Sequence, residues 1–180
     1  MADDQEYRGA MGGMTAEHMT EFLAGAPLAR LACLKPDGSP YVMPVWYQWD
    51  GESIWLVGRQ RSVWCEYIKN DPRISVVIDG NTFEGDSDEG SLIPKVYFEG
   101  VAEIVEEPNV GGAWVKVAED MSYRYLGPDG PTYLTSTLSQ PRWLIKMTPS
   151  ATKTWHGVGW ARRYWVEDTG GPSYDEAHST

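Results

Sequence analysis

The chain has 180 residues, and its 15 Lys and Arg against 26 Asp and Glu give a formal net charge of −11. This length suits one domain with a sizeable core, and the negative charge argues against nucleic acid or an anionic membrane as a partner, because neutralising phosphate needs a basic surface. Since no apolar run approaches the roughly 20 residues that span a bilayer, and the acidic start lacks the pattern of a signal peptide, we expect a cytoplasmic protein.

The first residues are polar and contain several glycines without any period, which predicts a flexible arm over residues 1–14. Thr15 can then cap a short amphipathic helix, whose apolar residues recur at helical spacing, and Gly25 can end it. We expect this helix to cover one end of the core.

β-branched and aromatic residues next predict three consecutive antiparallel strands. The first two are separated by a turn with Pro in its second position and Gly in its fourth, and Asp50-Gly51 is typical of a hairpin. The strands are expected over residues 28–34, 40–49 and 53–58.

The second half of the chain alternates between helical and strand patterns. Ser62 can cap a helix that closes at Asp71-Pro72, and residues 80–90 have the acidic, Gly- and Ser-rich composition of a solvated loop. Further strands are expected at residues 74–79, 95–105 and 142–147, and helical spacing at 110–124. Six short strands with few helices predict a mainly β barrel with peripheral helices, followed by a polar tail over residues 165–180.

The cysteines and histidines do not form a metal-binding pattern. Cys33 and Cys65 lie far apart, and the three histidines are scattered without a second ligand at metal-site spacing. We therefore expect no metal, and in a cytoplasmic setting no disulfide.

The aromatic residues are unusual in type, with nine Trp and ten Tyr but only three Phe. Trp and Tyr carry an N–H or O–H that needs a partner, so they concentrate at interfaces and at sites for flat ligands. The composition therefore indicates stacking surfaces without naming a ligand.

The segment Arg59-Gln-Arg-Ser62 opens a predicted helix directly after a predicted strand. Two guanidinium groups and a hydroxyl beside the amide groups of a helix start make an anion site, for which phosphate is the natural ligand. From spacing alone, Arg59 and Arg61 fit equally well as solvated loop charges that form weak surface pairs.

Several motifs in sequence order carry a family resemblance. Leu31-Ala-Cys-Leu-x-Pro-Asp-Gly-x-Pro-x-Val-x-Pro-Val-Trp-Tyr47 is followed by Asp50-Gly51, by Arg59-x-Arg-Ser-x-Trp64 and by Asp71-Pro-Arg73. Together they resemble the pyridoxamine 5′-phosphate oxidase-like split β-barrel flavoproteins, including their deazaflavin-using relatives. The resemblance implies a mainly β, six-stranded antiparallel split β-barrel with a few peripheral helices, formed by residues 15–164, and a homodimer with FMN at the subunit interface.

The resemblance also implies the cofactor-binding residues. Val45, Trp46 and Tyr47 match the flavin-lining strand, and Gly58, Arg59, Arg61 and Ser62 match the phosphate loop. Lys95 would come from the partner subunit, and Trp155 matches a late aromatic that reaches the cofactor edge. Val63 and Trp64 stand where the family often has a basic pair, so Arg59 and Arg61 would supply the charge while Trp64 either stacks on the cofactor or packs against the barrel.

The implied function is a flavin-dependent oxidoreductase that transfers hydride between FMN and a small organic substrate. No catalytic side chain is required, because the flavin ring accepts and donates hydride itself; His156 either faces the substrate or is exposed or packed. The alternatives are a deazaflavin-dependent reductase, a non-enzymatic binder of a flavin or another small ligand, and a dimeric interaction domain with an empty cleft. The acidic loop at residues 80–90 would repel a polyanionic cofactor tail and so favours FMN over a deazaflavin.

Overall fold

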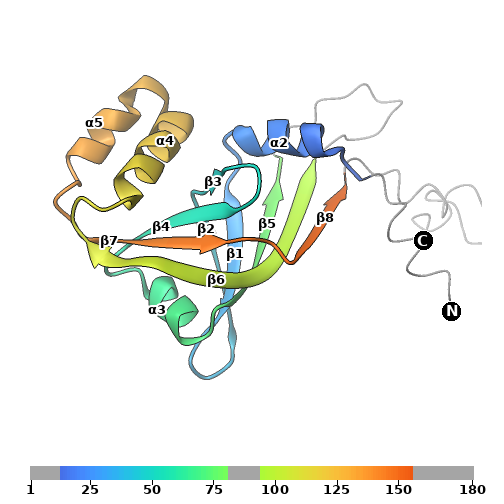
Figure 1. Ribbon diagram of the computed structural model, residues 1–180, viewed down its shortest axis with the longest axis horizontal. Helices are drawn as coiled ribbons and strands as arrows, with labels where there is room; N and C mark the ends of the chain where they lie inside the picture. The colour runs from blue at the N-terminus through green and yellow to red at the C-terminus, as the bar shows by residue number, and fades with distance from the viewer. Residues whose placement is uncertain (1–12, 81–93, 156–180) are drawn as a thin grey trace, which may run out of the picture.

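The computed structural model describes residues 13–80 and 94–155, in which eight strands form one antiparallel sheet (Figure 1). Along the sheet the order is β2-β1-β5-β6-β7-β4-β3, and β8 pairs with β6 beside this path. The strands are β1 (Ala29–Leu34), β2 (Pro40–Val45), β3 (Gln48–Trp49), β4 (Ile54–Arg59), β5 (Arg73–Asp79), β6 (Lys95–Asn109), β7 (Arg142–Met147) and β8 (Ala151–Trp155). The helices are α2 (Ala16–Ala24), α3 (Val63–Asn70), α4 (Trp114–Leu126) and α5 (Gly130–Thr135), with a 3₁₀ turn η1 (Gly127–Asp129) between the last two.

The long strand β6 belongs to both halves of the sheet. Its first residues pair with β5 and β8, whereas the stretch from Ala102 to Asn109 pairs with β7. Gly100 lies at this changeover, where an added Cβ would come within 2.9 Å of Met147 Sδ and 3.1 Å of Thr148 O. The missing side chain therefore lets the strands cross closely enough for the sheet to curl into a split barrel (Figure 1).

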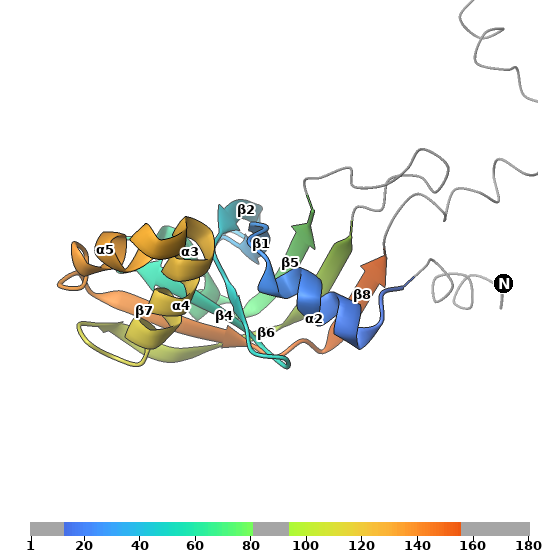
Figure 2. The same cartoon turned by 90° about the horizontal axis from the view of Figure 1, so that it is seen from above.

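The barrel core is closed at one end by α2. Thr15 caps this helix, since its Oγ1 accepts a hydrogen bond from the His18 N–H at 3.1 Å, and the helix ends at Gly25 as predicted. Leu23 on its inner face is fully buried among the strand residues of the main apolar cluster. Figure 2 shows α2 lying across the sheet, and near its C-terminus the Leu23 carbonyl oxygen accepts a hydrogen bond from Arg124 Nη1 of α4 at 3.2 Å.

The hairpin formed by α4, η1 and α5 packs on a second, smaller apolar cluster that includes Trp114, Leu134 and Leu144. Its two helices lie in close contact at Gly130, where an added Cβ would lie only 2.2 Å from the Ser122 carbonyl oxygen. The second cluster therefore joins the hairpin to the barrel strands β4 and β7.

The predicted fold class, a mainly β antiparallel split barrel with peripheral helices, is confirmed, but the count of six strands is wrong for the described residues. The strand expected over residues 40–49 is divided into β2 and β3. The two residues that separate these strands are Trp46, which faces a cavity, and Tyr47, which is buried in the core. Residues 151–155 form β8, which no sequence pattern had indicated.

The expectation of three consecutive antiparallel strands is also wrong in part. β1 pairs with β2 and β3 pairs with β4, but β2 lies at one end of the sheet order and β3 and β4 lie at the other. The turn signals identified the two tight connections correctly. They carried no information on the crossing between β2 and β3, where the chain passes from one half of the barrel to the other.

Three expectations fall outside the described residues: most of the arm over residues 1–14, nearly all of the acidic loop over 80–90, and the tail over 165–180. His156 also lies outside them. No helix among the described residues is long and apolar enough to cross a membrane.

Candidate functional site

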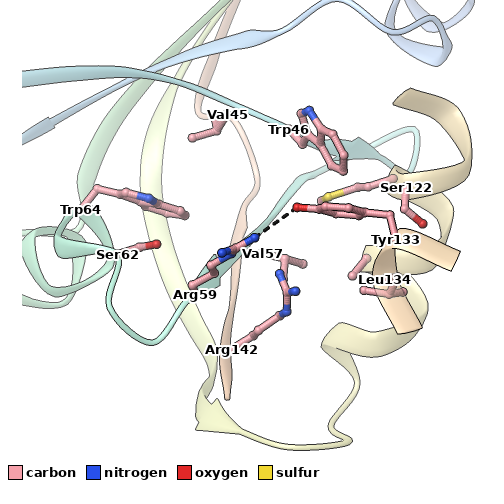
Figure 3. Close-up of a pocket in the computed structure, with 12 residues that line it drawn as sticks. Val45, Trp46, Val57, Arg59, Ser62, Trp64, Ser122, Tyr133, Leu134 and Arg142 are labelled. Carbon is pink, nitrogen blue, oxygen red and sulfur yellow. Dashed lines mark hydrogen bonds between the residues drawn. The ribbon is translucent and has the colours of Figure 1, made fainter. Parts of the chain in front are cut away.

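A cavity of about 220 Å³ lies between the barrel and the α4–α5 hairpin (Figure 3). Five of the ten predicted cofactor-binding residues line it, namely Val45, Trp46, Arg59, Ser62 and Trp64. The opposite wall comes from the hairpin, through Ala118, Met121, Ser122, Tyr133 and Leu134, and Val57 and Arg142 complete the lining. Residues from β2, β4, the start of α3 and the hairpin therefore meet at one place.

Trp46 forms an aromatic wall of this cavity. Its ring stacks on Tyr125 of α4, with ring centres 4.8 Å apart and planes inclined by 7°. Tyr133 of α5 lies next to the same ring at 6.0 Å, tilted by 57°. The indole is therefore held by the hairpin while it lines the cavity, which preorganises it to contact a flat ligand.

Trp64 combines the two alternatives that the sequence left open. The side chain is only 4% exposed and belongs to the main apolar cluster, so it packs in the barrel core. It also lines the cavity beside Ser62 (Figure 3).

The approach of α3 to β4 explains Gly58. A Cβ at this position would lie 2.1 Å from Cys65 Sγ and 3.1 Å from the Trp64 ring. No larger residue fits without a shift of the helix, so Gly58 sets how closely Trp64 and Ser62 approach the cavity.

Ser62 stands at the N-terminus of α3, but its side chain makes no capping hydrogen bond. The backbone instead forms a tight turn, in which the Ser62 N–H donates to Arg59 O at 2.8 Å and the Cys65 N–H donates to Ser62 O at 3.0 Å. Among the described residues the hydroxyl has no hydrogen-bond partner and remains available to a ligand in the cavity.

Arg59 and Arg142 bring two guanidinium groups into the cavity. The residues are direct partners across the β4–β7 pair, and Figure 3 shows both side chains entering the same space. Arg59 Nη2 donates to the Tyr133 hydroxyl at 3.1 Å, and Arg142 Nη2 donates to Thr137 Oγ1 at 2.6 Å. Neither arginine forms an ion pair with a carboxylate in the described part of the chain.

Arg142 is the more buried of the two, with 7% of its surface exposed. Its guanidinium lies over the Trp114 ring, 5.2 Å from the ring centre, and its Nε has no hydrogen-bond partner. Burial lowers the pKa of Arg142 from its usual value, and the nearby charge of Arg59 lowers this pKa further.

The other predicted residues lie outside the cavity lining. Tyr47 is fully buried, and its hydroxyl donates to Leu23 O at 3.0 Å; burial raises its pKa. Arg61 is exposed and borders a separate groove beside Gln140. Lys95 and Trp155 are partners across the β6–β8 pair, at the opposite end of β6 from the residues that pair near Arg142.

Arg142, Tyr125 and Tyr133 are site residues that the sequence analysis missed. The pattern placed Arg142 correctly at the start of a strand, but only the register of β7 against β4 brings it beside Arg59. The two tyrosines belong to a segment without a recognisable motif. The excess of tyrosine was the one signal that pointed toward them.

Comparison with known proteins agrees with this architecture. A family model described as pyridoxamine 5′-phosphate oxidase matches residues 15–156. A conserved hypothetical protein from Mycobacterium tuberculosis is 27% identical, with a TM-score of 0.66 over 92% of this chain and 96% of that protein. Two further solved structures share the fold. An F420 reductase is 23% identical, with a TM-score of 0.51 over 73% of this chain and 93% of that protein. An FAD-binding protein from Mesorhizobium loti is 20% identical, with a TM-score of 0.53 over 78% of this chain and 92% of that protein. Among curated proteins no match is found.

Proposed function

The chain belongs to the pyridoxamine 5′-phosphate oxidase family, and from that premise we propose that it binds FMN and acts as an oxidoreductase on a small organic substrate. Flavin-related binding or oxidoreduction is supported by the family and by its structural neighbours. The observation that carries the proposal is the cavity itself, which joins tryptophan walls to Arg59 and to an unengaged Ser62 hydroxyl.

The residues present fit a flavin. Arg59 and Ser62 suit its phosphate, because a guanidinium and a hydroxyl at a helix start both donate hydrogen bonds to an anion. Trp46 and Trp64 offer apolar surface to its planar ring. None of the described residues that line the cavity is a carboxylate or a histidine. This suits a reaction in which the side chains bind and orient while the bound flavin supplies the hydride chemistry.

The size of the cavity supports a site shared between two copies of the chain. Its volume of about 220 Å³ is below the roughly 300–1,000 Å³ of pockets that enclose a whole ligand. A homodimer would add a second wall, and Lys95 and Trp155, which lie away from the cavity of their own chain, are the residues that we propose for it.

A deazaflavin is the second candidate cofactor. Its phosphate can use the same Arg59 and Ser62 side chains, and one structural neighbour is described as an F420 reductase.

Titration of the purified protein with FMN and with a deazaflavin, followed by cofactor and tryptophan fluorescence, tests the proposal. We expect one of them to bind, and Arg59→Ala to weaken its binding about tenfold or more, the scale of a lost hydrogen bond to a charged group. Arg61→Ala, which removes an exposed arginine outside the cavity, serves as the matched control and should have a smaller effect.

Turnover with nicotinamide donors and with reduced cofactor then separates an enzyme from a binder. Steady turnover supports the oxidoreductase, and binding without turnover across these donors supports a cofactor-binding protein. If neither cofactor binds, the proposed function is wrong.

A further inference from the structure

We propose that Arg142 and Arg59 form a two-arginine anion site that takes the phosphate group of the bound cofactor. The inference deepens the proposed function and rests on it for the identity of the ligand. The arrangement of the two side chains is independent of that identity.

The first argument is the pairing of like charges. Arg59 and Arg142 face each other directly across the β4–β7 ladder, where two like charges destabilise a sheet. Their side chains lie on the same face and point into one cavity (Figure 3). An anion between them would convert this repulsion into two attractions.

The second argument is the burial of Arg142 without a counterion. Only 7% of its surface is exposed, and its hydrogen bond to Thr137 satisfies one nitrogen while Nε has no partner. A buried cation is costly unless it is paired and hydrogen-bonded. The described residues provide no carboxylate for it, so a ligand anion would supply the missing partner.

The third argument concerns the type of anion. Two planar guanidinium groups and the Ser62 hydroxyl present several N–H and O–H donors around one small space, and the tetrahedral oxygens of phosphate accept from such a set in more than one direction. Val63 and Trp64 follow Ser62, where the family often has a basic pair. Arg142 would supply the positive charge from another strand instead.

A purely structural role for Arg142 predicts different behaviour. In that case the side chain would only tie the segment after α5 to the barrel, through Thr137 and the Trp114 ring. Its replacement would then lower the thermal stability without changing the response to phosphate.

The test measures the affinity of the full chain for inorganic phosphate and for FMN by calorimetry, at low salt, with the thermal midpoint recorded in parallel. We expect Arg142→Gln to weaken both affinities about tenfold or more, and Arg142→Lys, which keeps the charge but not the planar fork, to weaken them less. Arg61→Gln is the matched surface control. Thr137→Val removes the protein acceptor of Arg142 and should leave phosphate binding intact.

The pH dependence of cofactor binding distinguishes a phosphate monoester from a phosphodiester. A phosphate monoester, as in FMN, gains its second charge with a pKa of roughly 6, so its binding should tighten between about pH 5 and pH 7.5. A phosphodiester, as in a deazaflavin, should bind with little change over the same range.

Unchanged phosphate affinity in Arg142→Gln or, if that variant does not fold, in Arg142→Lys overturns the proposal. A loss in Thr137→Val equal to that in Arg142→Gln also overturns it, because the tie to Thr137 would then account for the effect. Arg142-dependent binding of inorganic phosphate without binding of either cofactor supports the anion site, and the proposed function alone fails.

Discussion

Cys33 and Cys65 lie in the main apolar cluster, 3% and 0% exposed. Burial raises the pKa of both thiols, and a thiol reacts as its thiolate. We therefore predict that the folded protein does not react with Ellman's reagent at about pH 8, and that both thiols react after unfolding in guanidinium chloride. Rapid labelling of the folded protein at either position would contradict this assignment of the core.

Single residues of the site could be predicted where a local motif determines them. Arg59, Ser62 and Trp46 belong to short patterns whose chemistry can be read without the fold, and all three line the cavity. Tyr47 follows Trp46 directly, yet its side chain enters the core, because neighbouring residues of an extended segment point to opposite sides. Arg142 could not be predicted, since its role depends on the register between two strands that are distant in sequence.

The helix α4 begins without a cap from its own first residues, because Ala113 offers no side-chain acceptor. Glu106 of β6 replaces it, and its carboxylate accepts hydrogen bonds from the N–H groups of Ala113 at 2.9 Å and Trp114 at 3.2 Å. These hydrogen bonds lower the pKa of Glu106, and the bond from Ala113 has the larger effect. A strand residue therefore holds the hairpin at the edge of the cavity.

We predict that Glu106→Ala lowers the free energy of unfolding by about 1 kcal/mol at pH 7, the usual size of a lost N-cap. Because the folded pKa lies below the unfolded one, this stabilisation is present above the unfolded pKa, roughly 4.3, and is lost as pH falls through the folded pKa. Urea unfolding at pH 7 and at lower pH should show the difference between wild type and variant shrinking.

Glu107→Ala is the matched control for this prediction. Its carboxylate is 64% exposed and pairs with Lys69 at 2.8 Å on the surface, a contact of small energetic value. A destabilisation equal to that of Glu106→Ala would remove the capping explanation.

Elements were predicted well where propensity and turn signals agree. The capped helix α2, the strand β1 and the hairpin turn between β3 and β4 were found within a few residues. The strand β8 was missed because its five residues gain their place from pairing with β6 rather than from their own pattern. The helical segment after β6 was recognised by its spacing, but its packing against β4 and β7 was not.

At the scale of the whole molecule, the proposed dimer predicts complementation between defective chains. If Arg59 of one chain and Lys95 of another complete one site, Arg59→Ala and Lys95→Ala homodimers each bind the cofactor with weakened affinity at both sites. A mixed dimer carries one intact site, so co-expression in equal amounts should restore about one quarter of the sites. Cofactor titration of the mixture measures the recovered fraction.

The control combines two variants on the same side of the proposed site. Arg59→Ala and Trp46→Ala both alter the cavity of a single chain, so their mixed dimer has no intact site and should restore none. Recovery in both mixtures, or in neither, would contradict a site shared in this way.

One apolar cluster fills the barrel core, and a second joins the α4–α5 hairpin to β4 and β7; the hairpin and the barrel both line the cavity. Met121 and Ser122 line the cavity from the hairpin without belonging to the main barrel cluster, whereas Arg59, Arg142 and Ser62 line it from the barrel side. Substitution on the hairpin side can therefore vary one wall of the cavity while the side chains of the opposite, barrel-side wall stay in place.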